Sequence, residues 1–193
     1  LYLTKIEGIY GFETGVCFGE YFGNETKKEV SIFFRGTNSE EWLSIFTFPE
    51  GTINHIHNIV TCAKTKRVLV CTGDDDDSSV IWEFTDNFRS FRKILAGSQL
   101  FRSCFIHPTA TGFFYLTDAP NSQNYLVEVK EENGSIDYEV ISKLEGSVIY
   151  GETLTENKFF FSTTVEPDST LKGWRYLLSN KKGPGITTYQ VKG

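Results

Sequence analysis

His55 and His57 give the sharpest chemical signal in the sequence, because only Ile56 separates them. Residues i and i+2 of a β-strand point to the same face, so the two imidazoles are predicted to project together. Such a pair suits a divalent metal, or a base beside a group that hydrogen-bonds to substrate. Hydrogen bonds to neighbouring loops are the alternative role, since His-x-His alone is a weak motif.

Polar residues that end or open other apolar runs add a second set of candidates. Asp74 and Asp118 each close such a run, within Thr72-Gly73-Asp74 and Thr117-Asp118-Ala119-Pro120. Carboxylates there could bind sugar hydroxyls or act as acid and base, or simply accept backbone amides of the next turn. Arg102 could hold a substrate carboxylate or pair with Asp118.

The candidate set divides into three roles. The catalytic candidates are Asp74, Asp118, Glu152 and Tyr150, the substrate-binding candidates are Gln99, Arg102 and Tyr10, and the metal candidates are His55 and His57. A divalent metal is the one cofactor that these residues suggest.

Composition limits the partners. The 193-residue chain carries a formal charge of −6, which argues against bulk attraction to nucleic acid or to an anionic membrane. No apolar run approaches the roughly 18 residues that span a bilayer. We therefore expect a carbohydrate or another small polar ligand, no nucleic acid and no membrane insertion.

The four cysteines, Cys17, Cys62, Cys71 and Cys104, lie in apolar runs without metal-binding spacing. They are interpreted as small buried hydrophobic residues. Unpaired cysteines slightly favour a cytoplasmic location.

A repeat must position the candidate residues. Glycine opens four similar segments, GIYGFE at Gly8, GTINHIH at Gly51, GSQLFRS at Gly97 and GSVIYGE at Gly146. The period of about 43 to 49 residues suits a four-stranded propeller blade. Three further apolar runs follow each opening strand, bounded by Gly, Asn, Asp and Pro. In the last unit the third and fourth runs are GWRYLLS and ITTYQVK.

The sequence therefore predicts an all-β fold, a β-propeller of four-stranded antiparallel blades within residues 1–193. The expected blades are residues 1–50, 51–96, 97–145 and 146–193, four blades that either stand alone or belong to a six- or seven-bladed ring. The start of each first strand and the end of each second strand meet at one mouth of the central channel. This geometry is expected to gather the candidate residues there.

The segment FTDNFRSF, Phe84 to Phe91, resembles a degenerate Asp-box, the S-x-D-x-G-x-T-W turn of sialidase-like (BNR-repeat) propellers. Asp86, Ser90 and Phe91 hold the Asp, Thr and Trp positions, while Phe84 and Phe88 replace the Ser and Gly. The resemblance implies the propeller fold. It does not carry over sialidase activity, because the arginine triad of that family has no match here.

Three functions follow as alternatives. The leading hypothesis is a sialidase-like propeller that binds or processes carbohydrate at the channel mouth. The others are a non-catalytic protein-interaction scaffold, and a metal-dependent lyase or hydrolase that uses the His-x-His pair. If the chain is an enzyme, glycoside hydrolase-like or lyase-like chemistry is expected.

Overall fold

The computed structural model describes residues 2–63, 65–164, 172–175 and 185–191. Within these ranges helical conformation is confined to the 3-10 turn η1 (Gln99–Phe101) and to Trp174 and Arg175. The all-β prediction is confirmed. In the described residues, no helix is long and apolar enough to cross a membrane.

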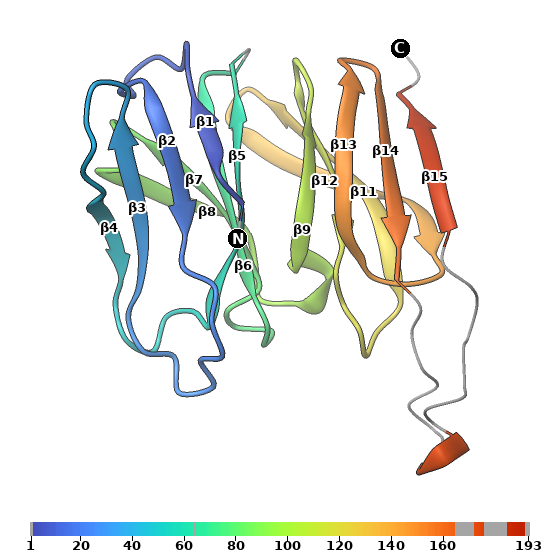
Figure 1. Cartoon of the computed structure of the whole chain (residues 1–193). Coiled ribbons are helices and arrows are strands. Elements are labelled where there is room, and N and C mark those ends of the chain that lie inside the picture. Colours follow the sequence, from blue (N-terminus) through green and yellow to red (C-terminus); the bar gives the residue numbers. More distant parts are fainter. Residues whose placement is uncertain (1, 64, 165–171, 176–184, 192–193) are drawn as a thin grey trace. The chain divides into compact units, whose positions relative to one another are not determined.

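The strands form four separate antiparallel sheets, and each sheet follows chain order from one edge to the other (Figure 1). The first sheet contains β1 (Thr4–Ile6), β2 (Gly15–Gly19), β3 (Val30–Gly36) and β4 (Leu43–Phe48). The second contains β5 (His55–Cys62), β6 (Arg67–Gly73), β7 (Val80–Thr85) and β8 (Ser90–Ala96). Inward-facing apolar residues alternate along β3, where Val30, Ile32 and Phe34 are buried, as expected of a half-buried strand.

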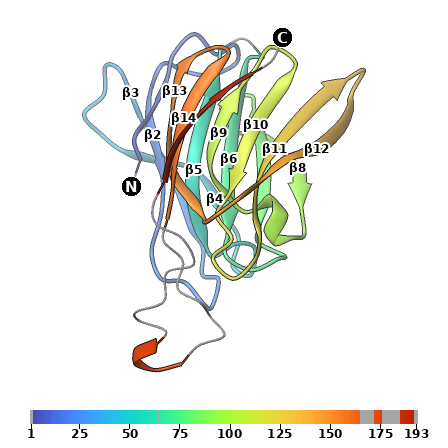
Figure 2. The ribbon, with the colours of Figure 1, turned by 90° about the vertical axis from the view of Figure 1, so that its right-hand side faces the viewer.

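The third and fourth sheets continue the pattern. The third contains β9 (Ser103–Pro108), β10 (Gly112–Thr117), β11 (Asn124–Glu132) and β12 (Ser135–Leu144), which lie side by side in Figure 2. The fourth contains β13 (Val148–Thr155), β14 (Lys158–Thr163) and β15 (Gly185–Gln190). The chain changes sheet near residues 50, 96 and 145, where the repeat places the unit boundaries. The four antiparallel sheets were thus predicted correctly, while the propeller itself stays a prediction.

The chain divides into two compact units, Leu1–Arg102 and Ser103–Gly193. In the first unit β5 contacts both β1 and β2, and one apolar core joins the two sheets. Aromatic rings fill that core, for example Phe48 against Trp82 with ring centroids 5.2 Å apart. In the second unit β13 contacts β9, and Phe105 packs on Phe159. In each unit the first strand of the later sheet thus contacts the earlier sheet.

The predicted opening strands lie too early in the chain. GTINHIH and GSQLFRS were expected to be strands, but β5 begins only at His55 and β9 only at Ser103. Gly51 and Gly97 have φ values of +83° and +93°, a left-handed conformation typical of turn glycines. These glycines therefore belong to the turns that precede the strands. In the first sheet the error has the opposite direction: β1 ends at Ile6, before Gly8, so GIYGFE is the connection to β2.

The last sheet also differs from the prediction. ITTYQVK was expected as a fourth strand, but β15 pairs directly with β14 and is the third strand of its sheet. The expected strand GWRYLLS begins at Gly173, and Trp174 and Arg175 are helical. The remainder of that segment lies outside the described residues.

Candidate functional site

His55, His57 and Asp74 meet at one end of the second sheet. His55 begins β5 and is paired with Gly73, the last residue of β6, so Asp74 follows directly beside it. The two imidazole Nε2 atoms lie 3.0 Å apart, and each lies 3.5 Å from Asp74 Oδ1. The prediction that the two histidines point together is confirmed.

A β-bulge contributes to this arrangement. Ile56 pairs with Thr72 and Asn58 with Cys71, so His57 is the extra, unpaired residue of β5. A bulge bends the strand and re-aims a side chain, and bulges are common beside active sites. The first strands of the third and fourth sheets show the same register shift near their starts, at Cys104 and Ile149.

Arg102 and Gln99 hold Asp74 in place. Arg102 Nη2 lies 2.9 Å from Asp74 Oδ1, and its Nη1 donates to the Asp74 carbonyl oxygen at 3.2 Å. Gln99 Nε2 donates to the same carbonyl oxygen at 2.8 Å. Both residues were expected on an opening strand, but Gln99 begins η1 and Arg102 caps its C-terminus. They reach Asp74 from the turn before β9.

The carboxyl group of Asp74 is strongly favoured in its ionised form. Its contacts with His55 and then with His57 lower its pKa well below the usual range, and the charge of Arg102 adds to this. Burial acts in the opposite direction and is outweighed. Asp74 is therefore an acceptor at neutral pH, unable to donate a proton.

Tyr21 completes the site and was not predicted. Its ring centroid lies 4.0 Å from that of His55 and 6.1 Å from that of His57. The residue follows β2 of the first sheet, and the next residue, Phe22, offers its carbonyl oxygen to His55 Nδ1 at 3.2 Å. A carbonyl only accepts, so Nδ1 carries the hydrogen and the lone pair of neutral His55 is on Nε2.

The site opens to solvent at two places. His55 and His57 are buried, whereas 38% of the Asp74 side chain and 59% of Tyr21 are exposed. The imidazoles therefore lie beneath a partly open carboxylate and an open aromatic ring. An aromatic surface beside directional polar groups is a common arrangement in ligand-binding sites.

Asp118 occupies the corresponding position in the third sheet. It directly follows β10, as Asp74 follows β6, and its Oδ2 accepts a hydrogen bond from Cys104 Sγ at 3.3 Å. Cys104 is the bulge residue there, so it corresponds to His57. The third sheet thus has the same local frame, a bulge residue in its first strand beside an aspartate that follows its second strand, with a thiol in place of an imidazole. The catalytic role of Asp118 stays a prediction.

Tyr150 and Glu152 both lie on β13 of the second unit, two residues apart, and both are exposed. Tyr150 pairs with Ser162, near the end of β14, as the repeat predicts. Their roles stay predictions. Glu166, also expected at a second-strand end, lies outside the described residues.

The expected placement of Tyr10 is wrong. Its ring lies 5.4 Å from Lys66 Nζ, and Lys66 immediately precedes β6, whereas Asp74 immediately follows that strand. At about 3.3 Å per residue, the two ends of β6 are roughly 20 Å apart. The error arises because β1 ends at Ile6, so Tyr10 follows the opening strand instead of starting it.

Two other features contain none of the residues of this cluster. The predicted turn FTDNFRSF joins β7 to β8, and Phe88, at the Gly position of the resembling motif, is buried with a left-handed φ of +64°.

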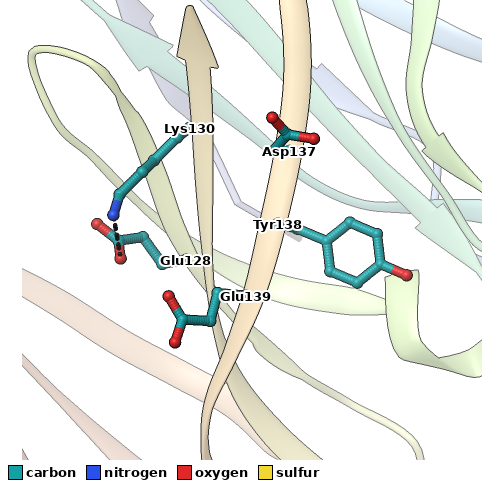
Figure 3. Close-up of a pocket in the computed structure, with 5 residues that line it drawn as sticks. All are labelled: Glu128, Lys130, Asp137, Tyr138 and Glu139. Carbon is teal, nitrogen blue, oxygen red and sulfur yellow. Dashed lines mark ion pairs between the residues drawn. The ribbon is translucent and has the colours of Figure 1, made fainter.

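A hollow of about 250 Å³ on β11 and β12 is lined by charged residues and one tyrosine (Figure 3). In Figure 3 Lys130 reaches Glu128, and the two form an ion pair of 3.3 Å. None of the candidate residues lines this hollow.

All four cysteines are buried, as predicted, and none of them forms a disulfide. Burial raises the pKa of the Cys17 thiol to about 12.

His107, the third histidine, is buried in the second unit and is held between Thr153 Oγ1 and the carbonyl oxygen of Glu156. It takes no part in the cluster of His55 and His57.

No protein-family model and no curated protein matches the chain.

Proposed function

We propose that this chain is a carbohydrate-directed module of the β-propeller type, either a glycan-binding domain or a glycan-processing enzyme. Its saccharide site is the cluster of Tyr21, His55, His57 and Asp74. The observation that carries the proposal is the exposed Tyr21 ring beside an ionised carboxylate and two imidazoles. Sugar rings present apolar C–H faces and polar hydroxyl edges, which these groups complement.

The position of each polar group fits this role. Asp74 remains ionised at neutral pH and, with two oxygens, can accept from a sugar hydroxyl while it keeps its contact with Arg102. Arg102 is committed to Asp74 and serves to position it. The site is therefore better suited to hydroxyl groups than to direct capture of a carboxylate by the guanidinium.

The propeller framework has its own support. Four meandering sheets appear in sequence, and within each unit the first strand of one sheet contacts the opening strands of the sheet before it. A repeated bulge near the start of three first strands indicates that the sheets are copies of one structural unit. The resemblance of FTDNFRSF to an Asp-box agrees with a sialidase-like member of this class.

A glycan array probed with the fluorescently labelled chain tests the function. We expect retention of one group of related saccharides, and a loss of about fivefold in affinity for Tyr21→Ala, the effect of removing an aromatic contact worth about 1 kcal/mol. Tyr10→Ala is the matched control, since that exposed tyrosine lies at the opposite end of β6 and its loss should change nothing.

The array and the variants also define the results that would overturn the proposed saccharide site. Retention of no saccharide, or equal binding by the Tyr21→Ala variant, would overturn the proposed site. Incubation of each retained glycan with the chain, followed by chromatography, then distinguishes binding from processing by the appearance of shorter products.

A further inference from the structure

We propose that His55 Nε2, His57 Nε2 and Asp74 Oδ1 together bind one zinc ion. The three residues belong to the first unit, and their ligand atoms all lie within 4.8 Å of one another. This inference goes beyond carbohydrate binding and does not depend on it, because it rests only on the geometry of the three ligand atoms.

The spacing of these atoms suits tetrahedral coordination. Zn–N and Zn–O bonds of about 2.0–2.2 Å require about 3.3–3.5 Å between neighbouring ligand atoms in a tetrahedron. The observed separations are 3.0 Å between the imidazoles and 3.5 Å from each imidazole to Asp74. Shifts of a few tenths of an ångström would complete the geometry, so the site needs little rearrangement to bind metal.

The surrounding hydrogen bonds orient two of the three ligands as they do in metal sites. His55 donates Nδ1–H to the carbonyl oxygen of Phe22, which leaves its Nε2 lone pair directed toward the cluster. Arg102 contacts Asp74 Oδ1, and a carboxylate oxygen has a second lone pair for a metal. Gln99 fixes the backbone of Asp74.

Three protein ligands leave one position of a tetrahedron for water or substrate. Zinc sites with three protein ligands are typical of catalysis, whereas structural sites have four. The partly exposed side chain of Asp74 lies at the boundary between the buried imidazoles and solvent. A ligand that entered there would reach the metal beside the Tyr21 ring.

A metal-free arrangement of the same atoms makes a different prediction. If His57 donates its Nε2–H to His55 Nε2, the 3.0 Å contact is a simple hydrogen bond between two neutral rings. Zinc would then have to break that bond and bind His57 in its other tautomer, with the hydrogen on Nδ1, and no tight stoichiometric binding would occur.

Isothermal titration of the chelator-treated chain with zinc chloride decides between the two. We expect one zinc ion per chain, and a loss of at least about 100-fold in affinity for His55→Ala or His57→Ala, since even the outer partners of metal ligands contribute 10- to 100-fold. Asp76→Asn is the matched control for Asp74→Asn, because it makes the same change two residues away and outside the ligand set. It should bind zinc as the unchanged chain does.

Circular dichroism of every variant checks that it is folded, and His57→Gln replaces His57→Ala if the smaller side chain prevents folding. Absence of zinc binding by the unchanged chain would overturn the proposal, as would equal affinity in folded variants of either histidine. Loss of zinc binding by Asp76→Asn as well as by Asp74→Asn would also overturn it, by pointing to the acidic loop instead.

Discussion

Gly73→Ala tests whether the close approach of His57 and Arg102 depends on a missing side chain. A Cβ atom at residue 73 would lie 2.9 Å from His57 Cε1 and 3.2 Å from Arg102 Cγ. Contacts between carbon atoms are normally about 3.5–4.0 Å. The added methyl group must therefore push the imidazole or the arginine stem away from Asp74 by several tenths of an ångström.

The magnitude follows from two opposing effects. Gly73 does not have a left-handed φ, so alanine is conformationally allowed and would by itself stabilise the fold by about 0.4–1 kcal/mol. Overpacking of a buried site costs about 1–3 kcal/mol. We expect a net loss of about 1–2 kcal/mol in the free energy of unfolding. Zinc affinity should also fall, although all three proposed ligands are retained.

Urea unfolding followed by tryptophan fluorescence measures the first effect, and zinc titration measures the second. Gly23→Ala is the matched control, because its Cβ would meet nothing closer than Glu25 Oε1 at 3.9 Å and its φ is not left-handed. That variant should be as stable as the unchanged chain or slightly more stable. If Gly73→Ala behaved like Gly23→Ala in both measurements, the packing argument would be refuted.

Two further predictions concern buried titratable groups. Burial lowers the pKa of His107, whereas an unfolded histidine takes up a proton near pH 6.5. Its contribution to stability is therefore present above that pH and is lost as the pH falls below it. Urea unfolding between pH 7.5 and 5.5 should show a decline in the free energy of unfolding. In the His107→Gln variant that decline should be smaller. The raised pKa of Cys17 makes its thiolate about a thousandfold scarcer than that of an ordinary cysteine at pH 8. Iodoacetamide should leave this thiol unmodified in the folded chain and label it in urea, and rapid labelling without urea would contradict the burial.

The second and third strands of the first three sheets were predictable because they are apolar runs that the fold largely buries. β6 is the clearest case, an apolar run whose residues from Val68 to Gly73 are all buried and which ends at a turn. The first strands were misplaced for a local reason. A glycine before an apolar run indicates a change of backbone direction, and the sequence does not say whether the strand begins at that glycine or several residues later.

The histidine pair was predictable because residues i and i+2 of a strand point to one face, although the bulge at His57 was not indicated by the sequence. Tyr21 was not, since its contact with His55 joins residues 34 positions apart in two different sheets. The signal that could have found it is its position just after the second strand of the first sheet, the place that Asp74 and Asp118 occupy in the second and third sheets. Arg102 was selected correctly, but its partner depends on the η1 turn, which no sequence pattern indicated.

The comparison of the second and third sheets separates the frame of the site from its chemistry. Both sheets have a bulge at the start of the first strand and an aspartate after the second strand, Asp74 or Asp118. In the third sheet the bulge residue is Cys104, which donates to Asp118 and is buried with it. The frame is therefore compatible with a purely structural pair. What the second sheet adds is a second histidine at residue 55, whose Nε2 lies 3.0 Å from His57 Nε2 and 3.5 Å from Asp74 Oδ1. Because the frame forms without histidines in the third sheet, replacement of His55 or His57 should remove the chemistry of the site and leave the sheet intact.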